Sequence, residues 1–202
     1  EGFHHQQGVD GVAVHAAEVL GKGQGEQAEV GELLPVVAAE AVGGFRQRAA
    51  RFEEANHGKI VITSEEMATL SLVQRAVFAH LGAARLLSTG DAELSAFWRD
   101  AATGLSCKCR PDWFNGEAIV DLKTCLDASS GGFARSIANF GYDIQAAYYV
   151  DGIKAVTGME LPFLFIAVEK EAPHAVAVYR ADPEVIEVGR KKYRAALQLL
   201  KW

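Results

Sequence analysis

Residues 107–124, CKCRPDWFNGEAIVDLKT, decide how this chain folds. They read as two β-strands joined at Asn115-Gly116, because Asn-Gly between two apolar runs is the strongest short-range signal of a β-hairpin. A two-residue type I′ turn at this point pairs Arg110 with Asp121 across the antiparallel strands. The pattern therefore predicts a hairpin that brings acidic and basic side chains together.

Two aspartates and a lysine share one face of this predicted hairpin. Paired residues in a sheet lie on the same face, and so do alternate residues along one strand. Asp112, Asp121 and Lys123 therefore project from one face, with Lys108 and Arg110 beside them. The hairpin is predicted to hold two carboxylates and a lysine on rigid strands.

This group of side chains has the chemistry of a site for a metal ion and a water. Mg²⁺ is a hard cation that proteins bind through one or two carboxylates, waters and substrate phosphate oxygens. A lysine two residues after a ligand can orient an attacking water and offset charge that develops on a phosphate. Asp-x-Lys also occurs often by chance, and the plain alternative is a strand salt bridge between Asp121 and Lys123. The rest of the chain has to decide between the two interpretations.

The composition indicates one globular domain, with or without an appendage. The chain has 202 residues, of which 50% are hydrophobic and 23% are charged. The net charge of −6 argues against a protein that coats nucleic acid by bulk electrostatics, but it does not exclude an enzyme that meets DNA locally. No apolar run approaches the ~20 residues that span a bilayer, and no basic segment followed by an apolar stretch suggests secretion.

The three cysteines, Cys107, Cys109 and Cys125, form no Cys-x-x-Cys pair and have no histidine at zinc spacing. Cys107 and Cys109 fall on the strand face opposite Asp112, so they are predicted core residues. An odd and sparse cysteine count fits a reducing compartment. These observations predict a cytoplasmic protein.

Residues 1–44 differ in amino-acid composition from the rest of the chain. They hold nine of the 20 glycines, contain neither Tyr nor Trp, and include the linker-like segment GKGQGEQ at 21–27. The segment has no firmly capped helix, so it is predicted to be a poorly ordered arm or one that depends on a partner. A globular domain is predicted over residues 45–202.

The predicted domain contains both helices and strands. A capping box at 63–66 opens a helix whose apolar residues recur at helical spacing. The apolar run at 161–169 is typical of a strand buried on both faces, and Asp182-Pro183 is a helix start with an aspartate cap. The expected order is a helix at 63–81, strands at 93–99, 105–113 and 117–124, a helix at 133–156, strands at 161–169 and 175–179, and a helix at 183–202.

Three further polar residues are candidates for the same site. Glu93 opens the first strand of the predicted three-stranded meander and could supply a third acidic group; its alternative is a solvated or salt-bridged strand residue. Gln145 and Tyr149 are four residues apart on a predicted helix, so they share a face one turn apart. Their plain alternative is a helix-surface glutamine and a core aromatic residue.

The element order and four motifs together resemble the RecE-type exonuclease (exonuclease VIII) family, in the RecB-like branch of the PD-(D/E)-x-K nuclease superfamily. The motifs are Arg110-Pro-Asp112, Ile119-Val-Asp121-Leu-Lys123-Thr, Asp127-Ala-Ser and Gln145-Ala-Ala-Tyr-Tyr149. Asp-x-Lys alone is a weak signal, but these motifs in this order and spacing are a strong one. The resemblance covers roughly residues 45–202. It implies an α/β (α+β) fold with a restriction-endonuclease-like core, in which helices flank a mixed central sheet.

The resemblance also implies roles for individual residues. Asp112 and Asp121 would ligate the divalent metal, and Lys123 would position the attacking water. Glu93 would match the acidic residue that precedes the metal ligands in related phage exonucleases. DNA contacts are expected from Lys108, Arg110, Gln145 and Tyr149, of which the last two would also support the site.

The family carries an upstream histidine on a helix, which completes its metal site. Gly11-Val-Ala-Val-His15 offers the expected spacing, although residues 1–44 otherwise do not resemble the family. His15 is therefore the candidate for a third metal ligand. Without such a histidine the metal site would be incomplete.

The function implied is a Mg²⁺-dependent exodeoxyribonuclease, with Mn²⁺ able to substitute, that degrades one strand of linear duplex DNA for phage- or prophage-type recombination. Its partners would be double-stranded DNA ends, a single-strand annealing protein and further copies of the chain in a ring-like homo-oligomer, with no membrane. The alternative is a non-catalytic module with a degenerate nuclease fold, which binds DNA ends or assembles with a partner.

Overall fold

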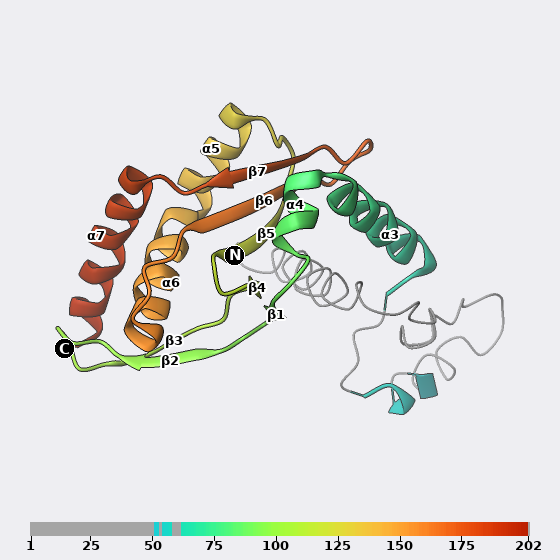
Figure 1. Ribbon diagram of the computed structural model, residues 1–202. Helices are drawn as coiled ribbons and strands as arrows, with labels where there is room; N and C mark the ends of the chain where they lie inside the picture. The colour runs from blue at the N-terminus through green and yellow to red at the C-terminus, as the bar shows by residue number, and fades with distance from the viewer. Residues whose placement is uncertain (1–50, 53, 58–61, 202) are drawn as a thin grey trace. The chain divides into compact units, whose positions relative to one another are not determined.

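A computed structural model describes residues 51, 52, 54–57 and 62–201 (Figure 1). The described residues divide into two compact units, one of residues 73–201 and one that includes residues 62–72. All strands described below belong to the first unit. The predicted arm at residues 1–44 lies outside the described residues, so the domain boundary at residue 45 stays a prediction.

A mixed five-stranded sheet forms the centre of the first unit. Its strands, in order across the sheet, are β1 (Asp91–Ala92), β4 (Trp113–Phe114), β5 (Ile119–Cys125), β6 (Phe163–Glu169) and β7 (Val176–Arg180). β5 and β6 are parallel, whereas the other neighbouring pairs are antiparallel. β6 is buried along almost its whole length, which confirms the prediction from its continuous apolar run.

A separate two-stranded sheet consists of β2 (Ala96–Arg99) and β3 (Ser106–Cys109). The predicted meander of three strands in one sheet is therefore wrong. The predicted strand at 93–99 is interrupted because Glu93 adopts a left-handed backbone, with φ of 57°, between β1 and β2. The predicted strand at 105–113 divides in the same way, since β3 pairs only with β2 while β4 pairs with β1 and β5.

The loop of the predicted hairpin has four residues, 115–118, in place of two. The prediction of a type I′ turn is wrong, because Asn115 is not among the described residues with positive φ. Its side-chain Oδ1 instead accepts hydrogen bonds from the backbone N–H groups of Glu117 (3.0 Å) and Ala118 (2.8 Å). Phe114 consequently pairs with Ile119, which is two residues from the predicted register. A shift of two residues leaves the side chains on their predicted faces.

The helices are α3 (Ser64–Ala79), α4 (Leu81–Leu86), α5 (Ser130–Phe140), α6 (Tyr142–Thr157) and α7 (Pro183–Leu200). The predicted capping box of α3 is confirmed: the N–H of Thr63 donates to the Glu66 carboxylate (2.6 Å), and the N–H of Glu66 donates to Thr63 Oγ1 (3.1 Å). The aspartate cap of α7 is confirmed too, because Asp182 Oδ1 accepts from the N–H of Val185 at 2.8 Å.

The single helix predicted for residues 133–156 is two helices. Gly141 lies between them in the left-handed conformation, with φ of 70°, and ends α5 where α6 begins. Glycine adopts this conformation without strain because it has no Cβ. Both helices then reach the same strand: the ring of Phe133 in α5 lies 5.5 Å from that of Phe165, and the ring of Tyr149 in α6 lies 6.2 Å from that of Phe163.

The core surrounds β5 and β6. Phe163 and Phe165 face α5 and α6, while Ile166 and Val168, which alternate with them, are also fully buried. α4 contacts β7, and α6 and α7 pack side by side (Figure 1). The cysteines are free and buried, as predicted for Cys107 and Cys109. Within the described residues, none of the helices combines the length and apolarity needed to cross a bilayer.

Candidate active site

A cleft of about 860 Å³ is lined by residues of β5, α5 and α6. Six of the residues that the sequence singled out line this cleft: Glu93, Arg110, Asp112, Lys123, Gln145 and Tyr149. A seventh, Asp121, is fully buried and contacts two of these lining side chains. The structure therefore brings together residues that lie up to 56 positions apart in the sequence, from 93 to 149.

Asp121 and Lys123 come from β5, the strand that is parallel to β6. They are two residues apart, so both project from the sheet face on which α6 packs. Lys123 Nζ lies 2.5 Å from Asp121 Oδ1, and Gln145 Nε2 of α6 donates a hydrogen bond to Asp121 Oδ2 at 2.7 Å. The two oxygens of the Asp121 carboxylate are therefore held by different elements, one by Lys123 of β5 and the other by Gln145 of α6.

Asp112 reaches the same place from the segment between β3 and β4. Its Oδ2 accepts a hydrogen bond from the backbone N–H of Leu122 at 2.8 Å. Leu122 lies between Asp121 and Lys123 in β5, so this bond fixes Asp112 beside the Asp-x-Lys motif. The prediction that Asp112, Asp121 and Lys123 project into one region is confirmed, although the turn that motivated it is different.

The two carboxyl groups are held in conditions that disfavour two negative charges. Burial, and next the charge of Asp121, raise the pKa of Asp112 from 3.8 to about 8, although Lys123 and the N–H of Leu122 oppose the shift. Burial also raises the pKa of Asp121, against the opposing effects of Lys123 and Gln145. Without a further cation, Asp112 is therefore largely protonated at neutral pH.

Lys123 is the cation that this structure supplies to the carboxylates. Burial lowers the pKa of Lys123, but the charges of Asp121 and Asp112 outweigh burial, and the pKa of the ammonium group is raised overall. Its Nζ also lies 4.7 Å from the centre of the Tyr142 ring, a cation–π contact. Lys123 therefore stays charged at neutral pH.

Glu93 and Arg110 line the cleft as an ion pair. Arg110 Nε lies 2.6 Å from Glu93 Oε2 and donates to the Glu93 backbone carbonyl at 3.2 Å. The backbone N–H of Glu93 in turn donates to the carbonyl of Asp112 at 3.1 Å. The left-handed turn at Glu93 thus places a salt-bridged pair next to Asp112, and its negative charge contributes to the raised pKa of that residue.

Tyr149 lines the cleft one helical turn beyond Gln145. Burial, and next the charge of Asp121, raise the pKa of its hydroxyl group, so Tyr149 stays protonated. The prediction that Gln145 and Tyr149 share one face of a helix is confirmed, and this face is directed toward Asp121.

The donor set fits a hard divalent cation. Asp112 and Asp121 are two neighbouring buried carboxyl groups whose ionised forms a cation would favour. Within the part of the chain that the structure describes, no three His, Cys, Asp or Glu side chains are arranged to hold a metal. Complete coordination would therefore need water, substrate oxygens or another ligand. His15, the predicted third ligand, lies outside the described residues.

Lys108 does not line the cleft. It lies on β3, and its Nζ is 5.6 Å from the centre of the Phe97 ring on β2. The expected DNA contact of Lys108 therefore stays a prediction, whereas Arg110, two residues later, lines the cleft.

The cleft also contains residues that the sequence did not single out. Tyr142 contacts Lys123, while Arg135 on α5 and Lys170 after β6 add positive charge to the lining. Lys170 had a recognisable signal: β5 and β6 are parallel, so residues that follow them meet at the same sheet edge. Tyr142 and Arg135 had none, because their positions depend on the break at Gly141 and on the docking of α5.

A mixed sheet flanked by helices, with two aspartates and an Asp-x-Lys lysine at one cleft, defines a protein of the PD-(D/E)-x-K nuclease superfamily. A family model described as a PDDEXK-like domain of unknown function (DUF3799) matches residues 37–202. The chain belongs to this family. The comparison with curated proteins found no significant match.

Comparison with solved structures supports the fold. A crystal structure from Eubacterium rectale, of a protein whose name provisionally calls it an exonuclease, superposes with a TM-score of 0.58 at 17% sequence identity. The match covers 78% of this chain, which spans 62% of the length of that protein. A second structure, that of SSO0001, matches over 73% of this chain and 70% of its own chain at 15% sequence identity. Its TM-score of 0.34 is too low to support a shared fold.

Proposed function

We propose that this chain is a divalent-metal-dependent exodeoxyribonuclease of the RecE type, which degrades one strand of linear duplex DNA. One observation carries the proposal: Asp112, Asp121 and Lys123 converge at a single cleft in a chain of the PDDEXK-like family. The nuclease class rests on this geometry and on the family. The exonuclease activity and its part in phage- or prophage-type recombination rest on the sequence resemblance.

In this proposal the residues of the cleft divide the work of phosphodiester hydrolysis. Asp112 and Asp121 would hold Mg²⁺, for which Mn²⁺ can substitute, and the ion would polarise the phosphoryl oxygen and lower the pKa of a bound water. Lys123 would orient the attacking water and offset negative charge as the water oxygen bonds to phosphorus, the bond to the leaving oxygen breaks and the proton lost by the water is returned through solvent to that leaving oxygen. Gln145 keeps Asp121 in position, and the protonated Tyr149 can donate to a phosphate oxygen.

The proposal is tested by incubating the purified chain with linear duplex DNA and Mg²⁺. We expect nucleotides to be released from the ends, with no release in a chelator, and a rate about 10²- to 10³-fold lower for Lys123→Ala. A circular dichroism spectrum of the variant controls for folding. If no DNA is degraded with Mg²⁺ or Mn²⁺, the proposed activity is wrong.

The substrate form separates an exonuclease from an endonuclease of the same superfamily. An exonuclease needs an end, so closed circular DNA should remain intact while the same DNA is degraded once it is linearised. Labels at the 5′ or 3′ end of one strand would then give the polarity of digestion. Cleavage of the closed circle would instead favour a site-specific or structure-specific endonuclease.

The resemblance also supports finer proposals about partners and setting. A ring-like homo-oligomer would encircle the DNA, a single-strand annealing protein would receive the exposed strand, and both would act in the cytoplasm. Light scattering of the purified chain, with and without DNA, tests the oligomer directly. A chain that stays monomeric under both conditions would contradict the ring.

A second candidate is a non-catalytic module that keeps the nuclease fold to bind DNA ends or to assemble with a partner. It is favoured by the absence, among the described residues, of three side chains arranged to hold a metal. Metal titration separates the two candidates, because a module without a metal site should show no stabilisation by Mg²⁺ or Mn²⁺.

A further inference from the structure

The two-stranded sheet of β2 and β3 has one buried face and one exposed face. Ala96, Cys107 and Cys109 on the inner face are buried, whereas Phe97, Arg99, Ser106 and Lys108 on the alternating positions are exposed. We call these four exposed residues the outer hairpin face. It continues along the chain into Arg110, which lines the cleft of the candidate active site.

The inner face fastens this hairpin firmly to α6. The ring of Trp98 lies 4.9 Å from the ring of Tyr148 on that helix. A Cβ added at Gly152 would collide with the Trp98 ring, so the helix and the strand approach as closely as a glycine permits. The outer hairpin face is therefore a rigid platform and not a loose flap.

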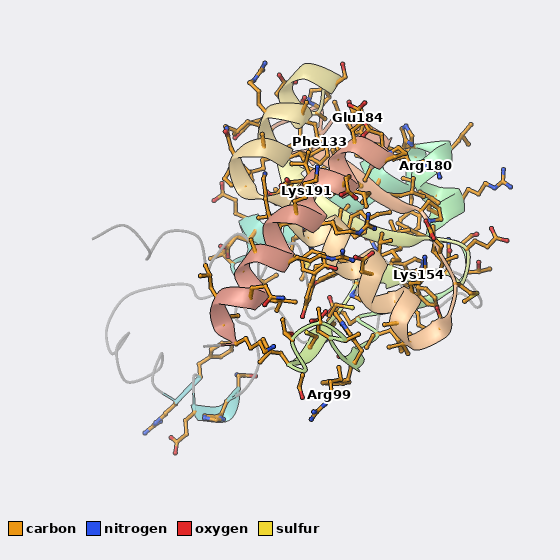
Figure 2. All side chains as sticks on the ribbon, turned by 90° about the vertical axis from the view of Figure 1, so that its left-hand side faces the viewer. Arg99, Phe133, Lys154, Arg180, Glu184 and Lys191 are labelled. Atoms are coloured by element: carbon orange, nitrogen blue, oxygen red, sulfur yellow. The ribbon has the colours of Figure 1, made fainter. Side chains whose placement is uncertain are left out.

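The exposed side chains combine an aromatic ring with positive charge. Phe97 is 67% exposed, which is high for a large apolar side chain. Lys108 stands over its ring, and Arg99 points away from the body of the unit (Figure 2). The nearby acids are already engaged: Glu93 pairs with Arg110, and Asp100 accepts from the N–H and hydroxyl groups of Thr103.

Positive charge and an exposed ring together match a single-stranded nucleic acid. Its phosphates attract lysine and arginine, and its unpaired bases can stack on an aromatic ring, whereas the bases of a duplex are stacked on one another. Phe97 pairs with Lys108, and Arg99 lies two residues further along β2 on the same face, about 6.6–6.8 Å away, so the two cations can meet phosphates on either side of one base. Arg99 and Lys108 supply this positive charge on a chain whose net charge is −6.

We propose that the outer hairpin face binds a single-stranded segment of DNA next to the cleft. Phe97 stacks on an unpaired base, while Arg99 and Lys108 contact phosphates on either side of it. The inference rests on the proposed function for the identity of the ligand as DNA, and it deepens that function by assigning a place to the separated strand.

The test measures binding in a chelator, so that no cleavage is needed. Fluorescence anisotropy compares a single-stranded oligonucleotide with a blunt duplex of the same sequence. We expect Phe97→Ala to weaken single-strand binding about 5- to 100-fold, since stacking on one base is typically worth ~1–3 kcal/mol, and Phe97→Trp to restore it. Leu199→Ala is the matched control, because Leu199 is a similarly exposed apolar residue (77%) on α7.

The cations are tested by the salt dependence of the same binding. Each phosphate contact of a single strand contributes a slope of about −0.7 in a plot of log affinity against log salt. Arg99→Ala and Lys108→Ala should each make the slope shallower by about that amount, while Lys191→Ala on α7, whose side chain is exposed, should not (Figure 2).

Two results would overturn the inference. Unchanged single-strand binding in Phe97→Ala would remove the stacking platform, and equal weakening of single-strand and duplex binding would mean that the face does not select an unpaired strand. These outcomes are independent of the proposed activity. A chain that binds through Phe97 but never cleaves would disprove the nuclease, whereas one that cleaves with no contribution from Phe97 would disprove only this face.

Discussion

Asp112 and Asp121 lie so close together, and so deeply buried, that the structure favours at most one of them in its ionised form. Asp121 has the ammonium group of Lys123 at 2.5 Å and the amide of Gln145 at 2.7 Å. Asp112 has only a backbone N–H, and its pKa is raised to about 8. A residue in this state is poised to exchange a proton for a metal cation.

The raised pKa of Asp112 predicts how stability depends on pH in a chelator. Between pH ~4 and ~8 the folded chain keeps a proton that the unfolded chain has released, so the free energy of unfolding falls as pH rises. Asp112→Asn removes this loss. We expect its melting temperature to exceed that of the unaltered chain by roughly 2–8 °C at pH 8, for a gain of about 1–2 kcal/mol, and by less at pH 5.

Asp100→Asn is the control for that measurement. Hydrogen bonds from Thr103 hold the pKa of Asp100 below its usual value, so its contribution to stability is fully present from pH 5 to pH 8 and is lost only at more acidic pH. Its melting difference should therefore stay constant from pH 5 to pH 8. If the melting temperature of Asp112→Asn also differed from that of the unaltered chain by the same amount at pH 5 and pH 8, the raised pKa of Asp112 would be contradicted.

Lys123 has a structural part besides its proposed catalytic one. Lys123→Ala would leave the fully buried Asp121 without its cation, which typically costs ~3–5 kcal/mol. Adding Asp121→Asn should recover most of that loss, because the remaining group is neutral. Urea unfolding of both single variants and the double variant gives the coupling free energy, and additive losses would mean that the pair is not coupled.

At the scale of elements, the site depends on how closely α6 is held. Its N-terminal half carries Gln145 and Tyr149 toward β5, and its far side packs on α7. Asp151 of α6 accepts hydrogen bonds from Arg190 Nε (2.8 Å) and Nη2 (2.7 Å) of α7. Burial raises the pKa of Asp151, but these bonds and that from the Tyr193 hydroxyl outweigh it and lower the pKa overall. The helix pair is therefore fastened by a charged network.

Gly189→Ala tests this close approach of α6 and α7. A Cβ at position 189 would collide with the backbone carbonyl of Asp143, which cannot move without shifting the helix. We expect a loss of about 1–3 kcal/mol, partly offset by the better helix propensity of alanine, together with weaker cleavage. Gly131→Ala in α5 is the matched control, since its Cβ would have only Arg135 Nη1 nearby, at 3.9 Å. If calorimetry gave the same loss of stability for Gly189→Ala and Gly131→Ala, the steric explanation would be wrong.

At the scale of the whole molecule, a cleft that holds charges of both signs lies in a chain that is negative overall. The chain carries a net charge of −6. The cleft lining places four cations, Arg110, Lys123, Arg135 and Lys170, beside three acids, Glu93, Asp112 and Asp127. A polyanion would therefore be attracted only through these cations, while the negative net charge opposes its binding elsewhere on the chain.

Stabilisation by a divalent metal tests whether the chain supplies a complete set of metal ligands. A ligand at 100 times its Kd stabilises the folded state by about 2.7 kcal/mol, so saturating Mg²⁺ or Mn²⁺ should raise the melting temperature by roughly 5–11 °C. His15→Ala should weaken this effect if His15 is a ligand. His57→Ala is the control, because His57 falls outside the predicted metal motif. Equal metal responses of the two variants would exclude His15 as a ligand.

Short-range patterns in the sequence determined the features that depend on neighbours within a few residues. The alternation along β5 placed Asp121 and Lys123 on one face, the caps at Thr63 and Asp182 placed two helix starts, and the apolar run at 161–169 identified a buried strand. These features follow from backbone periods and local hydrogen bonds, which a sequence contains directly. The order and spacing of the motifs supported the family resemblance, which in turn predicted that these residues share one site.

The tertiary structure alone decided what depends on distant contacts. The sheet divides at Glu93, where a left-handed residue redirects the strand, and Asn115 closes a longer loop with its own side chain. Gly141 divides one predicted helix into two so that both can pack on β6. The contact between Asp121 and Gln145 spans 24 positions. The pKa of Asp112 is decided in the same way, since burial and the charge of Asp121 exist only once the chain has folded around both carboxyl groups.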